Sequence, residues 1–317
     1  MTELAALFVL VALTLGAASL AAHLIRNRVG PTAFVENLTQ RIDAWWVMCI
    51  VLGVAFALGP GATILLFAFL SFAVLREFLT LTRRSRADHY ALIFAFFVAL
   101  PVQYLAIWQD WYGFFTVFIP VWTFMILPTL SVLRGQTEGF LTRMAETQWA
   151  LMVSVFCVSH VPALLFLDIP GFDKSGVLLV AFLVIVVQGS DVLQYIWGKM
   201  LGRTKVAPRT SPSKTWEGLI GGTLSAALLG AALFWLTPFP PLTAGLLAFV
   251  CAIVGFFGGL VLSAVKRDRG VKDWGTTIEG HGGFLDRLDG VVFAALIFFH
   301  LLRFFWVTNP ETFNIVF

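Results

Sequence analysis

Long apolar stretches separated by short polar segments run along the whole chain. Most of them approach or exceed the roughly 20 residues that an α-helix needs to cross a bilayer. The pattern therefore predicts an all-α fold, a polytopic membrane protein with about ten transmembrane helices. We place these helices at 4–25, 44–59, 61–79, 90–108, 111–133, 147–167, 176–198, 218–236, 242–264 and 290–306.

The N-terminal region leaves three points open. The stretch 44–59 is short enough to be re-entrant, and Gly59-Pro60-Gly61 could interrupt one helix rather than separate two. The first stretch has no positive charge before it and Arg26 and Arg28 after it, which favours a retained helix over a cleaved signal peptide. We expect one integral-membrane domain over 1–317. Its N-terminal helices (1–146) precede the helices and loops (147–317) that carry the polar motifs.

Positive charges alternate between the two ends of the predicted helices. All but two of the 21 Lys and Arg residues, Lys174 and Arg303, fall in or beside the loops that follow odd-numbered helices. Because Lys and Arg near helix ends favour the cytoplasmic side, these loops are predicted to be cytoplasmic and both termini to lie outside. We therefore expect the protein in the cell (inner) membrane, with any active site on the cytoplasmic face.

The composition agrees with a membrane protein and narrows the chemistry. Hydrophobic residues make up 59% of the chain and charged residues only 12%, far from the averages of soluble domains. Cys49, Cys157 and Cys251 lie in apolar stretches without CxxC spacing or nearby histidines, which is typical of reduced, buried residues. The chain has neither a Walker A sequence nor GxGxxG, so a nucleotide would be held by the loops. We expect no nucleic-acid partner.

The loop over 263–290 concentrates carboxylates and cations beside a Gly-rich turn. Asp286 and Asp289 are three residues apart, so on a helix they share one face and repel unless a cation neutralises them. Mg²⁺, or another hard divalent cation, typically takes one or two protein carboxylates together with phosphate oxygens and water. Asp273 could supply a third oxygen. The alternative is a solvated loop without a metal site, in which ion pairs form around Arg287.

The Gly-rich turn of this loop suits an anion. Gly282 and Gly283 beside His281 have no Cβ atom, so backbone N–H groups could approach a phosphate closely. His281 could act as a general acid, as a hydrogen-bond donor to phosphate, or as a structural residue of the turn. Four cations are available to balance phosphate charge: Lys266, Arg267, Lys272 and Arg287.

A second polar segment covers 190–218. Asp191 lies near the cytoplasmic end of an apolar helix, and a carboxylate at such a position is costly enough to indicate function. The prolines of the loop that follows limit its flexibility and favour a cluster of Arg209, Ser211 and Lys214. The alternative is that Ser211-Pro212 merely ends a turn before the next helix.

Both segments carry a resemblance to a known family. Ser263-x-x-Lys266-Arg267, Lys272-Asp273-x-Gly275 and His281-Gly282-Gly283-x-x-Asp286-Arg287-x-Asp289 resemble the diagnostic motif of the phosphatidate cytidylyltransferases, also called CDP-diacylglycerol synthases. The segment Lys205-x-Ala-Pro-Arg209-x-Ser211-Pro212-x-Lys214-Thr215-Trp216-Glu217-Gly218 resembles a second conserved block of that family.

The resemblance implies a metal-dependent transfer between CTP and phosphatidic acid, giving CDP-diacylglycerol and pyrophosphate at the membrane. It implies catalytic roles for Asp191, Asp273, His281, Asp286 and Asp289, with the four aspartates as metal ligands and Asp191 as either a fourth ligand or an orienting group. The substrate-binding residues implied are Arg209, Ser211, Lys214, Ser263, Lys266, Arg267, Lys272, Gly282, Gly283 and Arg287.

Two departures from the family pattern leave the lipid preference open. Glu279 stands where the family usually has Pro, and the block that begins at Asp191 carries Gln194 before Tyr195. Both would suit a divergent paralogue that uses another lipid phosphate. A CTP-dependent kinase of a membrane alcohol is a rival enzyme, and a transporter with Asp191 on an ion path is a rival of another class. The sequence does not decide between a monomer and a homo-oligomer.

Overall fold

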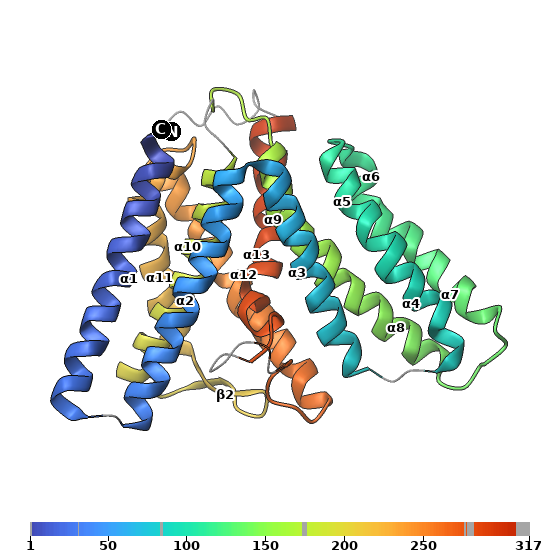
Figure 1. Ribbon diagram of the computed structural model, residues 1–317, viewed down its shortest axis with the longest axis horizontal. Coiled ribbons are helices and arrows are strands. Elements are labelled where there is room, and N and C mark those ends of the chain that lie inside the picture. The colour runs from blue at the N-terminus through green and yellow to red at the C-terminus, as the bar shows by residue number, and fades with distance from the viewer. Residues whose placement is uncertain are drawn as a thin grey trace.

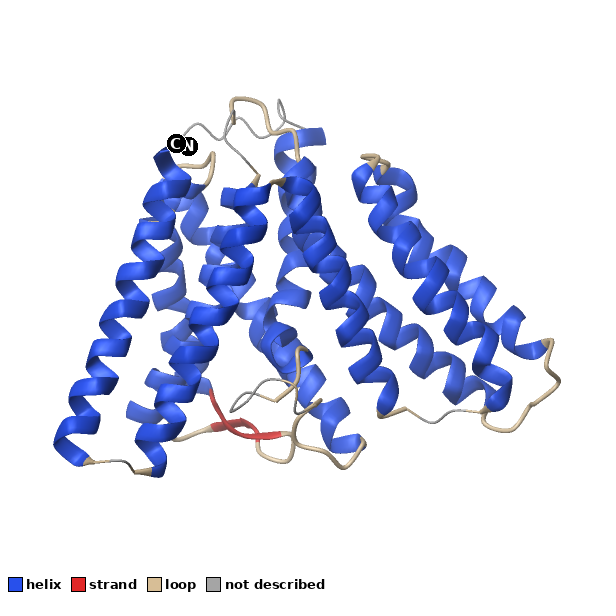
Figure 2. Ribbon diagram, in the orientation of Figure 1, coloured by secondary structure: helices blue, strands red, loops and turns tan. Residues whose placement is uncertain are grey.

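The structure of the protein is a computed structural model that describes residues 2–30, 32–82, 85–172, 176–275, 277 and 282–308. Helices dominate these residues, and the strands form one small hairpin (Figure 2). Nine helices of the described residues are long and apolar enough to span a membrane. They are Glu3–Val29, Val35–Leu58, Pro60–Thr80, His89–Trp108, Tyr112–Val132, Phe140–Phe166, Val177–Met200, Pro241–Asp268 and Leu285–Val307. The expected all-α membrane architecture is confirmed.

Four of these spans combine α-helical and π-helical segments, whereas the others are continuous α-helices. Two π-helical segments, η2 and η3, lie beside or contain Pro101 and Pro120, whose missing N–H groups interrupt the regular helical ladder. The N-terminal elements are α1 (Thr2–Val29), α2 (Ala33–Leu58), α3 (Pro60–Thr80), η1 (Arg86–Asp88), α4 (His89–Phe94), η2 (Ala95–Ala99), α5 (Leu100–Trp108), α6 (Tyr112–Val117), η3 (Phe118–Thr123), α7 (Phe124–Val132), α8 (Phe140–Leu151), η4 (Met152–Cys157), α9 (Val158–Ala163) and η5 (Leu164–Phe166).

The C-terminal elements are α10 (Val177–Met200), β1 (Lys205–Ala207), β2 (Ser211–Thr215), α11 (Trp216–Ala232), η6 (Phe234–Leu236), α12 (Pro241–Asp268), α13 (Leu285–Leu302) and η7 (Arg303–Thr308). The expected helix 218–236 is α11 followed by η6. Because α11 has only 17 residues, it falls short of the lengths of the nine longer spans. With α11 included, the described residues contain the helices that the hydropathy pattern predicts.

The prediction of a short second helix was wrong, because α2 has 26 residues and begins at Ala33. Its first turns carry polar residues, among them Glu36 and Arg41, which the hydropathy pattern reads as loop. The chain reverses at Gly59, whose φ of +98° suits glycine, so α2 and α3 are two antiparallel helices rather than one broken helix (Figure 1).

Helices α10, α11, α12 and α13 pack closely on one another, and α4, α5, α6 and α7 lie beyond α3 (Figure 1). Glycines allow this closeness: a Cβ on Gly222 would lie 2.7 Å from the Cα of Gln194, and one on Gly255 3.4 Å from the carbonyl oxygen of Gly290. Gly222 of α11 and Gly255 of α12 therefore serve close helix packing.

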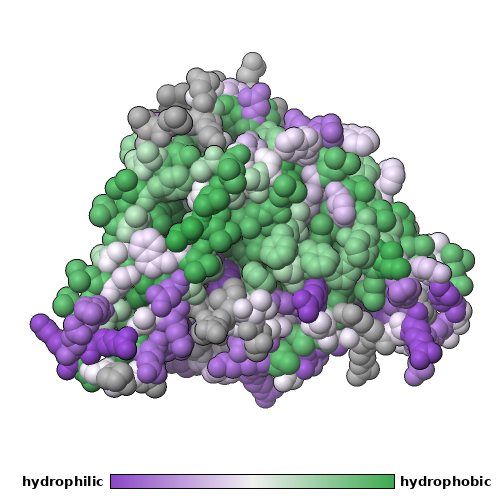
Figure 3. All heavy atoms as spheres, in the orientation of Figure 1, coloured by the Kyte–Doolittle hydropathy of each residue, from purple (hydrophilic) through white to green (hydrophobic). Residues whose placement is uncertain are grey.

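The two ends of the bundle differ in polarity. The start of α1 and the end of α13 lie at one end, opposite the β1–β2 hairpin (Figure 1). Hydrophobic residues form a broad band across the visible face, and most hydrophilic residues gather along the end that carries the hairpin (Figure 3). The loops on which the sequence concentrates its basic residues are therefore at a single end.

Candidate active site

A cavity of about 770 Å³ opens between the α1–α2 pair and helices α10, α12 and α13. Both polar segments of the sequence contribute to it, because the β1–β2 hairpin and the first turns of α13 meet at this end of the bundle. Its polar and charged lining includes Arg41, Gln188, Asp191, Gln194, Ser213, Lys214, Thr215, Asp286, Arg287 and Asp289.

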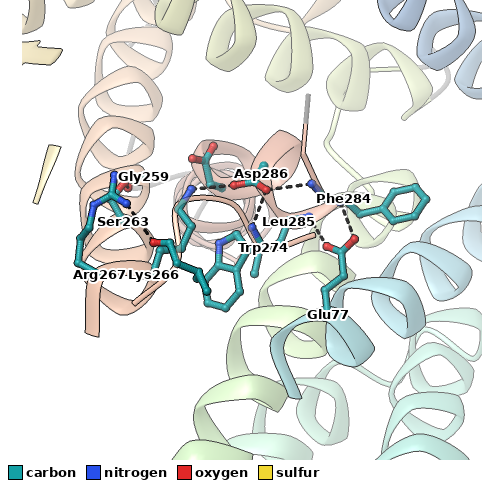
Figure 4. A network of polar contacts seen from close by, with 12 residues as sticks. Glu77, Gly259, Ser263, Lys266, Arg267, Trp274, Phe284, Leu285 and Asp286 are labelled. Atoms are coloured by element: carbon teal, nitrogen blue, oxygen red, sulfur yellow. Dashed lines mark hydrogen bonds and ion pairs between the residues drawn. The ribbon is translucent and has the colours of Figure 1, made fainter. Parts of the chain in front are cut away.

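Asp286 organises the loop that enters α13 (Figure 4). Its Oδ1 accepts a hydrogen bond from the ammonium of Lys266 at 2.7 Å, and both side chains are largely buried. Its Oδ2 accepts hydrogen bonds from the backbone N–H groups of Trp274 at 2.8 Å and Gly283 at 2.9 Å. Both carboxylate oxygens are thus engaged by the protein itself.

Glu77, in the last turn of α3, holds the start of α13 from the other side (Figure 4). Its carboxylate accepts hydrogen bonds from the backbone N–H groups of Phe284 at 2.9 Å and Leu285 at 3.0 Å, and from the hydroxyl of Thr277 at 3.2 Å. A Cβ on Gly283 would lie 2.6 Å from Oε2 of Glu77. Gly283 is therefore needed where this carboxylate approaches the backbone.

Lys214 reaches the cavity from strand β2. Its ammonium donates to the carbonyl oxygen of Phe256 at 3.0 Å and lies 4.4 Å from the centre of the Phe256 ring. A Cβ on Gly259 would be 2.9 Å from Nζ of Lys214 and 3.5 Å from Oδ2 of Asp289, so Gly259 makes room for both groups. Burial lowers the pKa of the Lys214 ammonium, while the Asp191 and Asp289 carboxylates oppose that shift.

Asp191 and Asp289 face the same space from two helices, α10 and α13. They are within electrostatic range of each other and of the Lys214 and Arg287 cations. Oδ1 of Asp289 also accepts a hydrogen bond from the N–H of Gly290 at 2.8 Å. Two partly buried carboxylates within electrostatic range of two cations form a site that can hold both a metal cation and anionic phosphate groups.

The β1–β2 hairpin explains how Lys214 enters the cavity. The strands are antiparallel, with Lys205 opposite Thr215 and Ala207 opposite Ser211. The carboxylate of Glu217 accepts hydrogen bonds from the N–H groups of Arg203 and Thr204, each at 3.1 Å, and closes the base of the hairpin. The hydroxyl of Thr215 accepts from the N–H of Gly218 at 3.1 Å and caps α11. The segment is more than a turn before the helix.

Several predicted site residues lie outside the cavity lining. Lys272 and Asp273 are exposed, and Arg209 is exposed at the turn of the hairpin. Arg267 donates to the carbonyl oxygens of Val271 at 3.0 Å and Thr210 at 3.4 Å, and so joins α12 to the hairpin.

Three further predicted residues lie near the site without lining the cavity. Ser263 donates to the carbonyl oxygen of Gly259 at 2.6 Å, within its own helix. Ser211 lies partly buried in β2. Gly282 has a φ of +81°, and a Cβ there would lie 2.6 Å from Oδ2 of Asp286. His281 and Glu279 lie outside the described residues.

Sequence reasoning missed four residues of this region: Arg41, Glu77, Gln188 and Gln194. Nε2 of Gln188 donates to the carbonyl oxygen of Arg287 at 2.7 Å. Gln194 is 7% exposed, and its Nε2 has no hydrogen-bond partner among the described residues. Only Gln194 was signalled by the sequence, as a departure from the family pattern.

The residues present fit a hard divalent cation that arrives with substrate. Among the described residues, no three His, Cys, Asp or Glu side chains form a closed metal centre. Mg²⁺ needs only one or two protein carboxylates when phosphate oxygens and water complete its octahedron. Asp191 and Asp289 provide such a pair, whereas Asp286 is engaged by Lys266 and Asp273 is exposed.

Comparisons with known proteins give one family match and several similar proteins. The cytidylyltransferase family matches residues 39–305, a range that contains both polar segments. The uncharacterized protein YnbB of Escherichia coli K12 is 39% identical over 271 residues, which cover 84% of this chain and 88% of that protein. A phosphatidate cytidylyltransferase of Bacillus subtilis is 32% identical over 220 residues, covering 68% of this chain and 77% of that enzyme. One of Brucella abortus is 38% identical over 155 residues, covering 46% of this chain and 54% of that enzyme.

Proposed function

The chain belongs to the cytidylyltransferase family, and we propose that it transfers the cytidylyl group of CTP to phosphatidate, giving CDP-diacylglycerol and pyrophosphate. The main support for this proposal is that one cavity within the membrane bundle is lined by two carboxylates and two cations: Asp191, Asp289, Lys214 and Arg287. Two similar proteins are phosphatidate cytidylyltransferases, and their reaction needs a site for several phosphates beside a lipid.

We propose that this cavity faces the cytoplasm of a cell whose inner membrane holds the protein. The support is electrostatic, because the cavity lies at the end of the bundle where the hairpin and the basic loops gather (Figures 1 and 3). Lys and Arg near helix ends favour the cytoplasmic side. CTP is a cytoplasmic nucleotide, so this orientation gives the site its substrate.

In the proposed reaction, a phosphate oxygen of the lipid attacks the α-phosphorus of CTP. A new phosphorus–oxygen bond forms, the bond between the α- and β-phosphates breaks, and its electron pair leaves with pyrophosphate. No side-chain nucleophile is needed, so the work of the protein is positioning and electrostatic stabilisation.

Lys214 from β2 and Arg287 from α13 would bind phosphate oxygens, and Asp191 and Asp289 would hold a divalent cation. Such a cation supplies positive charge that offsets the charge developing on the phosphates. Asp286 and Glu77 would keep the entry to α13 in place through the hydrogen bonds they accept.

The test is an assay of the purified protein with labelled CTP, Mg²⁺ and a panel of lipid phosphates and membrane alcohols. We expect release of pyrophosphate and formation of CDP-diacylglycerol with phosphatidate. Formation of CDP from CTP and a membrane alcohol, without pyrophosphate, would replace this proposal with a CTP-dependent kinase.

A further inference from the structure

A second cavity, of about 580 Å³, lies between α2, α3, α10 and α13. Its size is within the roughly 300–1,000 Å³ of typical ligand pockets. Much of its lining is apolar and includes Met48, Leu52, Phe67, Leu70 and Val291. A cavity of this character in a membrane-spanning bundle suits a hydrocarbon chain.

This apolar cavity adjoins the polar cavity of the candidate active site. Trp45, Gln188 and Arg287 line both. Trp45 comes from α2, while the hydrogen bond from Gln188 to the carbonyl oxygen of Arg287 joins α10 to α13 at the boundary. A molecule with a charged head and an apolar tail could therefore occupy both spaces at once.

Two guanidinium groups lie at this boundary, and the carboxylates of Asp286 and Asp289 are also within electrostatic range of Arg287. Arg41 lines the polar cavity from α2 and lies within electrostatic range of Arg287 on α13. Nε of Arg287 is buried and has no hydrogen-bond partner in the part of the chain that the structure describes. Two guanidinium groups repel each other, and a phosphate between them removes the repulsion and accepts charge-assisted hydrogen bonds from both.

Helix α2 covers the centre of the bundle loosely. In the most apolar 18-residue stretch of each helix, 11% of the residues of α2 and 6% of those of α1 are buried, compared with 61% for α10. The bond from Nε1 of Trp46 to the hydroxyl of Ser19, at 3.0 Å, ties α2 to α1. Residues of α2 line both cavities, among them Trp45.

From these observations we propose that α2 carries the binding site for the acceptor lipid, a long-chain lipid phosphate. Arg41 and Arg287 bind its phosphate in the polar cavity, and one acyl chain lies past Trp45 in the apolar cavity. The identity of this lipid as substrate rests on the proposed function, but the site itself is a binding site that can be measured without turnover.

The test measures equilibrium binding to the purified protein in the absence of CTP, by native mass spectrometry. The ligands are dioleoyl phosphatidate, dihexanoyl phosphatidate and dioleoylglycerol. Met48→Trp fills the apolar cavity, and Val54→Trp is its control, because Val54 is exposed on the same helix and does not line either cavity. Arg41→Gln removes a phosphate contact, with Arg28→Gln as control at an exposed position of α1.

We expect Met48→Trp to weaken dioleoyl phosphatidate about tenfold or more and dihexanoyl phosphatidate less than about twofold, because only the long chain fills the cavity. Arg41→Gln should weaken both phosphatidates about tenfold and leave dioleoylglycerol unchanged. Each control variant should bind like the wild type.

Equal weakening of the long-chain and short-chain lipids by Met48→Trp, or no effect of either cavity variant, would overturn the proposal. So would binding of dioleoylglycerol as tight as that of dioleoyl phosphatidate. If the expected binding pattern is found but no pyrophosphate is released, the lipid site stands and the proposed reaction fails.

Discussion

Replacing Glu77 tests whether a residue of the N-terminal half positions the candidate active site. Glu77 is 8% exposed, and its carboxylate accepts three hydrogen bonds, two of them from the backbone at the start of α13. A hydrogen bond to a charged group contributes about 1.5–3 kcal/mol. A carboxylate at a helix N-terminus adds about 0.3–1 kcal/mol through the helix dipole.

Glu77→Gln keeps the size of the side chain and one acceptor oxygen, but turns an NH₂ group toward backbone donors. We therefore expect this change to cost about 2–4 kcal/mol of local stability, roughly one lost charge-assisted bond and the dipole term. Because a displacement of about 1 Å at an active site can cost about a hundredfold in rate, turnover should fall at least tenfold.

The assay compares the apparent melting temperature, kcat and the KM for CTP of wild type, Glu77→Gln and Glu138→Gln, all purified in the same detergent. Glu138 is exposed in the loop between α7 and α8, so Glu138→Gln is the control that removes the same charge away from the site. We expect a lower melting temperature and lower kcat for Glu77→Gln alone. Wild-type melting and turnover in that variant would refute the positioning role of Glu77.

Three further changes separate the roles of the cavity residues. Asp289→Asn should keep folding but reduce turnover about a hundredfold or more, whereas Asp286→Asn, which weakens the contacts to Lys266 and the turn, should also lower the melting temperature; normal melting of Asp286→Asn would argue against its structural role. Because the pKa of Lys214 is lowered, its protonated, phosphate-binding form is lost at lower pH than that of an exposed lysine. We therefore expect kcat/KM to fall as pH rises through that pKa, and Lys214→Arg to move the fall to higher pH. The same pH profile in wild type and variant would exclude Lys214 as the phosphate-binding group. Gln194→Ala should leave the melting temperature nearly unchanged, because losing packing and removing an unpaired buried donor oppose each other, and a large loss of stability would indicate a partner for Nε2.

The hydrophobic pattern predicted the membrane helices well because each of them must present apolar residues to lipid over most of its length. It failed at the start of α2, where residues such as Arg41 face a polar cavity yet belong to a helix. Motif spacing identified the two segments that meet in the cavity, and Asp191, Lys214 and Asp289 are indeed brought together there.

The role of Glu77 could not be predicted in the same way. Its partner Phe284 is 207 residues away in the chain, and only tertiary structure brings them together. We predicted from the sequence that the N–H of Gly283 would approach an anionic ligand. In the structure Gly283 instead accommodates the Glu77 carboxylate, and its N–H donates to Asp286. Residue types therefore indicated phosphate chemistry. Which of these groups bond to the protein itself, and which remain for a ligand, depends on tertiary contacts that motif spacing does not encode.

The most direct test of the central claim is pyrophosphate release by the purified wild-type protein and Asp289→Asn, with CTP, Mg²⁺ and phosphatidate in mixed micelles. The account predicts stoichiometric pyrophosphate and CDP-diacylglycerol from the wild type and about a hundredfold less from the variant. No pyrophosphate from the wild type with any lipid phosphate, or equal release by both proteins, would contradict it.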